Sequence, residues 1–231
     1  MANPPVKFDP PSTPIRAVVF DLDGLLVNTE DLYEKSGNEL LSQHGHTMND
    51  NLREQIIGLT AHKSLQTMID AFALDTTTEE LYAESEAIMQ RLIANELQPM
   101  PGMLELLARL EASHVPRIVA TCGQRHYAHE LLEVCNVAHH FELVLTVDDV
   151  ERGKPDPEIY ELAAQRLGLP PVAMMVLEDS ANGVRAASAA GAYTVAVPNR
   201  HTASHSFEGA SLIAETLADQ RILIALGLGL G

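Results

Sequence analysis

The chain has 231 residues, of which 46% are hydrophobic, and its formal net charge is −17. This length and apolar content suffice to bury the core of one moderate domain or of two small ones. The strong negative charge argues against nucleic acid or an anionic membrane surface as a partner, because both attract clustered Lys and Arg.

The ends of the chain carry no segment that predicts export or membrane insertion. Residues 1–14 are rich in proline and lack an apolar run, so we predict a disordered lead-in rather than a secretory signal. The apolar, glycine-rich end, residues 222–231, is too short to span a bilayer. A chain of this size needs no disulfide, so Cys122 and Cys135 are predicted to be free thiols in a reducing cytoplasm.

The first predicted strand covers residues 16–20 and is apolar on both faces, as in a parallel sheet. Asp21 and Asp23 follow at its end, and in an extended chain two carboxylates at this spacing face the same side. Gly24 then allows a sharp turn. Because ligands bind at the carboxyl ends of parallel strands, this pair is a candidate for chemistry. An ordinary strand-to-turn signal would use the same residue types.

Residues 29–98 have a different pattern. Apolar residues recur there at helical spacing without a candidate strand, and Thr78 with its two following acids favours the start of a long last helix. Residues 97–102, which contain two prolines and a glycine, predict a hinge. We therefore expect an all-helical insertion at 29–98, within a core formed by residues 15–28 and 99–231.

After the hinge, predicted helices and strands alternate, which indicates an α/β core with a parallel, Rossmann-like sheet. The expected helices are 103–112, 127–134, 157–167 and 184–190, and the expected strands are 117–120, 143–146, 174–177 and 193–197.

Polar side chains follow each of the next three strands. Thr121 follows the strand at 117–120, Lys154 comes after the one at 143–146, and Glu178 with Asp179 follows the one at 174–177. In a parallel sheet these ends meet at one edge. Carboxylates gathered there would repel one another unless a cation lay among them, and an all-oxygen ligand set favours Mg²⁺.

Together, the four stretches around Asp21, Thr121, Lys154 and Glu178 resemble the haloacid dehalogenase superfamily of phosphotransferases, in the branch with a helical cap after the first strand. The resemblance covers about residues 15–200. It implies a Rossmann-like core, Mg²⁺ as cofactor and a covalent aspartyl-phosphate intermediate.

The resemblance also implies a role for each core residue. Asp21 is expected to be the nucleophile, and Asp23 the acid and base that serves the leaving group and then water. The phosphoryl oxygens are expected to contact the Thr121 hydroxyl, the backbone amides of Cys122 and Gly123, and the Lys154 ammonium. The expected magnesium ligands are Asp21, Asp23 through its carbonyl, Asp179, and Glu178 directly or through water.

The cap is expected to close over the site and to select the leaving group of the substrate. The candidate substrate-binding residues share a predicted position at the mouth of the site or in the cap. They are Asn28, Tyr33, Gly58, His62, Lys63 and Arg125.

These features predict a Mg²⁺-dependent phosphatase that hydrolyses a small phosphorylated metabolite, such as a sugar phosphate, phosphoglycolate or a nucleoside monophosphate. One alternative is a phosphosugar mutase resembling β-phosphoglucomutase. That family has His where this chain has Tyr33, and cap Lys and Arg residues near Ile57 and Ala61, which are absent here. Another alternative is a binding protein without catalysis, but such a protein would need neither a nucleophile nor an acid. We expect no nucleic-acid or membrane partner, and a monomer or weak homodimer.

Overall fold

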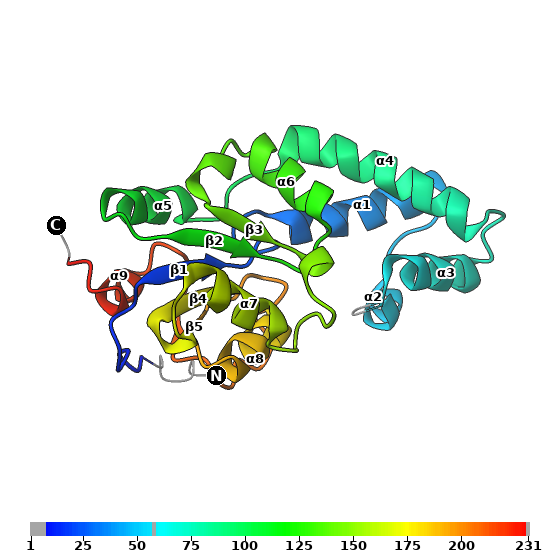
Figure 1. Ribbon diagram of the computed structural model, residues 1–231. Helices are drawn as coiled ribbons and strands as arrows, with labels where there is room; N and C mark the ends of the chain where they lie inside the picture. The colour runs from blue at the N-terminus through cyan, green and yellow to red at the C-terminus, as the bar shows by residue number, and fades with distance from the viewer. Residues whose placement is uncertain (1–7, 57–58, 230–231) are drawn as a thin grey trace. The chain divides into compact units, whose positions relative to one another are not determined.

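The structure is a computed structural model that describes residues 8–56 and 59–229. The chain divides into two compact units (Figure 1). Met1–Asn28 and Gln98–Gly231 form the core unit, and Thr29–Leu97 form the helical unit.

The core unit contains a parallel six-stranded sheet with strand order β3-β2-β1-β4-β5-β6. The strands are β1 (Ala17–Phe20), β2 (Arg117–Ala120), β3 (Leu143–Leu145), β4 (Met174–Glu178), β5 (Tyr193–Ala196) and β6 (Leu212–Ile213). All four residues of β1 are fully buried at the centre of the sheet, as their uninterrupted apolar run predicts. The predicted α/β class with a parallel sheet is confirmed.

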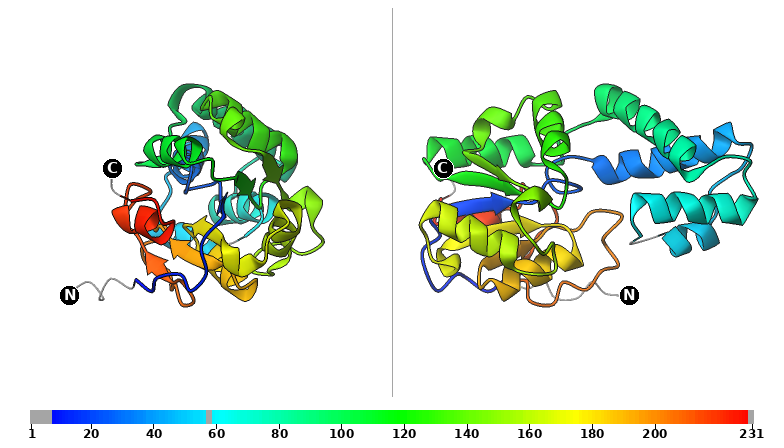
Figure 2. Two further views of the ribbon diagram at one scale, coloured as in Figure 1. Left: turned by 60° about the vertical axis from the view of Figure 1, so that its left-hand side comes forward. Right: turned by 45° about the vertical axis from the view of Figure 1, so that its right-hand side comes forward.

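Helices cover both faces of this sheet. The core helices are α5 (Met103–Ala112), α6 (Arg125–Val134), α7 (Glu158–Leu167), α8 (Ala181–Ala189) and α9 (Gln220–Ala225), with short 3₁₀ turns at Ala138–His140, Val147–Asp149 and Pro171–Ala173. Figure 1 shows α5 and α6 on one face and α7 and α8 on the other, and Figure 2 shows the same layers in two other views. Small side chains of α7 and α8, such as Ala163 and Ala186, pack with Val19 and Val176 of the sheet.

The strand register aligns the carboxyl ends of the central strands. Val19 pairs with Ile118 on one side and with Val176 on the other. One step beyond β1, the Asp21 N–H donates to the Leu177 carbonyl at 3.0 Å, which continues the ladder. The ends of β1, β2 and β4 therefore lie at one edge of the sheet, where ligands bind in open α/β folds.

The helical unit contains only helices in its described part, residues 29–56 and 59–97. They are α1 (Thr29–Gln43), α2 (Asp50–Ile56), α3 (Ala61–Phe72) and α4 (Thr78–Glu96). α1 packs along α4, α3 packs on α4, and α2 packs on α3. A capping box starts α4: the Glu80 N–H donates to Thr77 Oγ1 at 3.2 Å, and the Thr77 N–H donates to Glu80 Oε2 at 3.0 Å.

The segments that lead into and out of the helical unit pair with each other on the core side. The Asn28 N–H donates to the Gln98 carbonyl at 3.1 Å, and the Met100 N–H donates to the Leu26 carbonyl at 2.8 Å. Val27 and Pro99 form an antiparallel bridge between these segments. The chain thus enters and leaves the helical unit through two segments that pair as a short two-stranded ribbon.

The predicted disorder at residues 1–14 is wrong for the described part of this segment, which begins at residue 8 and pairs with the sheet. Phe8 forms an antiparallel bridge with Leu212, and the Asp9 N–H donates to the Ser211 carbonyl at 2.9 Å. The physical reason is the short strand β6, which offers an open sheet edge to the chain. Neither β6 nor α9 was predicted from the sequence. Residues 1–7 lie outside the described residues.

Among the residues that the structure describes, no helix is both long and apolar enough to cross a membrane. The thiols of Cys122 and Cys135 are both free, as predicted.

Candidate active site

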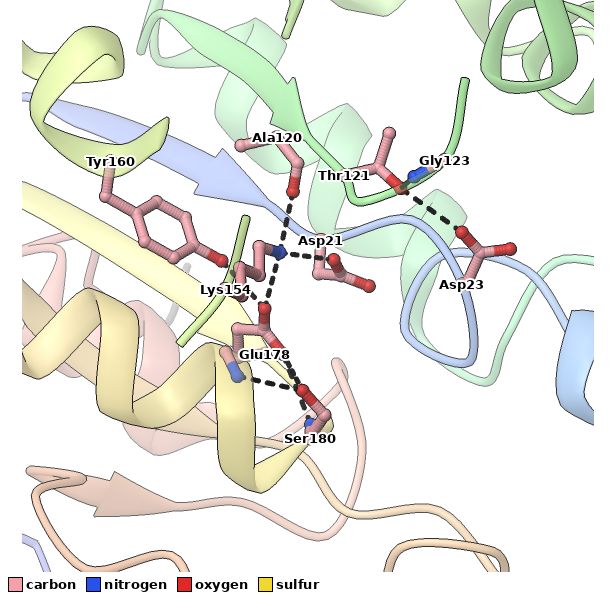
Figure 3. Close-up of polar contacts among 10 residues, drawn as sticks. Asp21, Asp23, Ala120, Thr121, Gly123, Lys154, Tyr160, Glu178 and Ser180 are labelled. Carbon is pink, nitrogen blue, oxygen red and sulfur yellow. Dashed lines mark hydrogen bonds and ion pairs between the residues drawn. The ribbon is translucent and has the colours of Figure 1, made fainter. Parts of the chain in front are cut away.

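The centre of the candidate site is the ammonium group of Lys154, whose side chain is only 3% exposed. Lys154 Nζ donates to Asp21 Oδ1 at 2.6 Å, to Glu178 Oε1 at 2.6 Å and to the Ala120 carbonyl at 2.9 Å (Figure 3). These bonds use all three of its protons. Lys154 thereby connects the ends of β1, β2 and β4, and the second oxygen of Asp21 points away from it (Figure 3).

Glu178, the last residue of β4, is fully buried and receives donors on both carboxylate oxygens. Besides Lys154, the Tyr160 hydroxyl of α7 donates to Oε1 at 2.7 Å. The Ser180 N–H and hydroxyl donate to Oε2 at 3.2 and 3.0 Å. Ser180 Oγ also accepts from the Gly183 N–H at 3.0 Å and so caps α8. All hydrogen-bond acceptor positions of Glu178 are therefore in use, and the carboxylate holds Lys154 in place.

The pKa values in this cluster reflect burial among carboxylates. Burial raises the pKa of the Asp21 carboxyl to about 8, and Glu178 and Asp23 add to this rise although Lys154 opposes it. Burial alone would lower the pKa of Lys154, but the facing Asp21 and Glu178 carboxylates raise it well above its usual value. The two carboxylates thus keep Lys154 charged, whereas Lys154 alone does not bring the pKa of Asp21 back to its ordinary value.

The donor set fits a divalent cation. Carboxylate oxygens of Asp21, Glu178 and Asp179 lie within 4.8 Å of one another, and all three residues are buried. Oxygen ligands of this kind suit Mg²⁺, whose charge would offset the burial and, to a smaller extent, the neighbouring carboxylates that raise the pKa of Asp21. Because Lys154, Tyr160 and Ser180 already use both oxygens of Glu178, contact between this residue and the cation, directly or through water, would require one of these donors to give way, while Asp21 and Asp179 fit direct ligation.

Asp23 and Thr121 lie together near Asp21 (Figure 3). Thr121 Oγ1 donates to Asp23 Oδ2 at 3.2 Å and accepts from the Gly123 N–H at 2.9 Å (Figure 3). In this arrangement the Gly123 amide, which we predicted to bind a phosphoryl oxygen, donates to the Thr121 hydroxyl instead. A bound phosphoryl group would have to replace Thr121 as its acceptor. Cys122 lies next to Thr121, beyond the end of β2, and is exposed.

Two predicted mouth residues of the core unit have structural partners. Asn28 Oδ1 accepts from the Gln98 N–H at 2.7 Å, so this side chain joins the two connecting segments. The Arg125 guanidinium pairs with Asp149 Oδ1 at 2.7 Å, and the Arg125 N–H donates to Asp148 Oδ2 at 2.9 Å. These contacts order the start of α6 and leave a role in substrate binding as a prediction.

The predicted cap residues belong to the helical unit. Tyr33 on α1 is 48% exposed. His62 and Lys63 are exposed on α3, and the His62 ring stacks on Tyr82 with 4.8 Å between ring centres. Gly58 lies outside the described residues.

The sequence missed three residues that organise the site. Tyr160 was predicted only as part of a helix, and Ser180 and Asn199 were assigned no role. Ser180 could have been found as a Ser just before a helix, which is a common cap signal. The Tyr160 hydroxyl reaches Glu178, and Asn199 Nδ2 reaches Asp179 Oδ2 at 2.8 Å, only through tertiary packing, of which the sequence carries no local signal.

Gly183 leaves room for the Glu178 carboxylate beneath α8. A Cβ at Gly183 would lie 1.7 Å from Glu178 Oε1 and 1.8 Å from its carboxyl carbon. We therefore expect Gly183→Ala to displace Glu178 and to lower the free energy of unfolding by about 1–3 kcal/mol, as measured by urea unfolding. Gly153→Ala is the control: nothing lies within 4 Å of a Cβ there, and its stability should stay within about 0.5 kcal/mol of wild type. An equally stable Gly183→Ala protein would contradict the observed packing.

The raised pKa of Asp21 predicts a pH-dependent stability in the absence of metal. Because the pKa of Asp21 is about 8 in the folded protein and 3.8 in an unperturbed aspartate, folding takes up a proton between these pH values. Stability is therefore expected to fall as the pH rises through this window. We expect the melting temperature in EDTA to decrease toward pH 8 more steeply in wild type than in Asp21→Asn. Parallel profiles of the two proteins would show that Asp21 does not titrate in this way.

Comparisons with known proteins agree with this geometry. The family model "Haloacid dehalogenase-like hydrolase" matches residues 18–197. A protein from Thermotoga maritima named "Phosphorylated carbohydrates phosphatase" is 30% identical over 77% of this chain and 82% of its own length. A Drosophila melanogaster protein, provisionally named a pseudouridine-5'-phosphatase, is 34% identical over 87% of this chain and 89% of its own. A crystal structure from Thermotoga maritima, provisionally identified as a beta-phosphoglucomutase, has a TM-score of 0.82 and 26% identity, and the match covers 91% of this chain and 98% of that one. The predicted family is thereby confirmed: the chain belongs to the haloacid dehalogenase-like hydrolases.

Proposed function

We propose that this protein is a Mg²⁺-dependent phosphatase that hydrolyses a small phosphorylated metabolite through an aspartyl-phosphate on Asp21. The observation that carries the proposal is the buried Lys154, which contacts both Asp21 and Glu178 at the edge of the sheet. A buried carboxylate with a lysine on one oxygen and a second oxygen directed away is suited to attack an anionic phosphorus centre. Relatives named for phosphorylated carbohydrates and for pseudouridine-5'-phosphate support the substrate class.

The two half-reactions use the two aspartates in turn. Asp21 forms a bond to phosphorus as the bond to the leaving oxygen breaks, and Asp23 gives that oxygen a proton. Water then forms a bond to phosphorus as the Asp21–phosphorus bond breaks, and Asp23 takes up a proton from the water. The Lys154 ammonium, beside Asp21, would offset negative charge on the phosphoryl group, and the Thr121 hydroxyl would have to leave Asp23 to donate to a phosphoryl oxygen.

The residues that would hold Mg²⁺ are Asp21 and Asp179 through their carboxylates and Asp23 through its carbonyl, with Glu178, directly or through water, once one of its present donors gives way. The ion would neutralise charge on the phosphoryl oxygens and orient them for attack. This chain's contribution is to keep the carboxylates close together and their donors in place before the substrate arrives.

Hydrolysis is favoured over phosphoryl transfer between sugar positions. A mutase must hold a second phosphate and keep water from its phosphoenzyme. The cap of this chain has Tyr33 at the position where the mutase family has His, and the His62 ring stacks on Tyr82 within the helical unit. In the cap stretch around residues 57–63, this leaves Lys63 to bind a second phosphate.

We further infer that the enzyme works in the cytoplasm. Its two free thiols fit a reducing compartment. Its net charge of −17 makes a small phosphorylated molecule, held by local cations, a better partner than nucleic acid.

The test is phosphate release from a panel of sugar phosphates, phosphoglycolate and nucleoside monophosphates, with Mg²⁺ and with EDTA. We expect release that requires Mg²⁺. Interconversion of hexose phosphates in the presence of a bisphosphate, without net release, would replace the proposal with a mutase. The absence of both phosphate release and interconversion would contradict catalysis on these substrates and would favour a binding protein.

A further inference from the structure

The strand order places the end of β5 next to the end of β4, and the chain after β5 brings Asn199 to the candidate metal-binding carboxylates. Asn199 Nδ2 lies 2.8 Å from Asp179 Oδ2 and 3.1 Å from the Gly24 carbonyl oxygen. Asp179 itself is only 3% exposed. One amide nitrogen thus connects a carboxylate that follows β4 with the turn that follows Asp23.

Backbone donors determine which way the Asn199 amide faces. The N–H groups of His201 and Thr202 donate to Asn199 Oδ1 at 2.8 and 3.2 Å, and the Asn199 N–H donates to Thr202 Oγ1 at 3.0 Å. Because the amide oxygen receives these two donors, the NH₂ group must face Asp179 and Gly24. The side chain then uses its two donor hydrogens and accepts two bonds, so its orientation is fixed by geometry.

We propose that Asn199 is a positioning residue for the divalent-cation site. Asp179 lies in a cluster with Asp21 and Glu178, and these like charges favour its movement away from them. The Asn199 NH₂ opposes this movement by binding one Asp179 oxygen. Its bond to the Gly24 carbonyl restrains the turn next to Asp23, whose own carbonyl belongs to the proposed ligand set. Partners outside the ligand shell that orient ligands in this way commonly change metal affinity tenfold or more.

This inference rests on the proposed function, because it assumes that the carboxylates bind Mg²⁺. It adds Asn199, which follows β5, to the residues that form the site. It also predicts a defect that appears without any substrate, since the misplaced group is a metal ligand rather than a substrate contact.

The test is isothermal titration of the full-length, metal-free protein with MgCl₂. We expect Asn199→Ala to weaken Mg²⁺ binding about tenfold. Asn199→Ser should act in the same direction, because its hydroxyl can still accept from the Thr202 N–H but is too short to bind Asp179. Asn182→Ala is the control, since Asn182 is an exposed asparagine on α8 that bonds Arg185, and its Mg²⁺ affinity should equal that of wild type.

Thermal unfolding in EDTA shows whether each variant is folded. The test needs only one folded Asn199 variant, either Asn199→Ala or Asn199→Ser. Asn199 variants with wild-type Mg²⁺ affinity would overturn this inference and leave the proposed function intact. A wild-type protein that does not bind Mg²⁺ would overturn both. At saturating Mg²⁺ we expect the KM for substrate to stay near its wild-type value; a raised KM with unchanged Mg²⁺ affinity would assign Asn199 to the substrate instead.

Discussion

Asp21→Asn is expected to lower turnover of the best phosphate monoester by about a thousandfold or more while the protein remains folded. An amide oxygen is a far weaker nucleophile than a carboxylate, so the bond to phosphorus would not form at a useful rate. The amide can still accept from Lys154, whose Nζ lies 2.6 Å from Asp21 Oδ1 in the wild-type protein, so the fold should survive. Steady-state kinetics with saturating Mg²⁺ measure the effect.

Asp70→Asn is the matched control for this change. Asp70 is an exposed aspartate on α3 that accepts from Gln66 at 2.9 Å, and its conversion to Asn changes the net charge by the same amount. Its turnover should equal that of wild type. If Asp21→Asn retained wild-type turnover, Asp21 would not be the nucleophile.

Lys154→Met is expected to be the most destabilising exchange in the site. It would leave the Asp21 and Glu178 carboxylates buried without the cation that contacts both of them. Removal of one partner from a buried ion pair typically costs about 3–5 kcal/mol. We expect a loss of this size in urea unfolding with EDTA, and partial recovery when Mg²⁺ supplies positive charge.

Two further variants isolate the electrostatic cause. Lys63→Met removes an exposed cap lysine and should change stability by no more than about 0.5 kcal/mol. Lys154→Met should cost less in an Asp21→Asn background than in wild type, because a buried amide, unlike the Asp21 carboxylate, needs neither a cation nor a proton to offset its charge. Equal costs in both backgrounds would show that packing of the lysine stem, and not charge pairing, stabilises the site.

The sequence predicted the core of the site because each central strand is an apolar run that ends at a polar residue. Asp21, Thr121 and Glu178 mark the ends of β1, β2 and β4, and the rule that parallel strands share an edge brings them together. The sequence also predicted the helical unit and the start of α4 at Thr78, because helical periodicity and acidic first turns are local properties.

The remainder depends on contacts between distant residues. Tyr160 occupies an apolar position of α7, and only the packing of this helix on the sheet determines that its hydroxyl meets Glu178. Asn199 lies in the loop after β5, and the amino-acid composition of this loop does not predict its path. β6 is two residues long, too short for a periodic pattern, and the pairing of Phe8 with it depends on an edge that the sequence does not reveal.

The most direct measurement of the central claim is mass spectrometry of the protein after rapid acid quench during turnover of a small phosphate donor such as acetyl phosphate with Mg²⁺. We expect one added phosphoryl group on the peptide that contains Asp21 in wild type, and no such adduct in Asp21→Asn. Steady phosphate release from wild type with the phosphoryl group on another residue would contradict the assignment of Asp21 as the nucleophile.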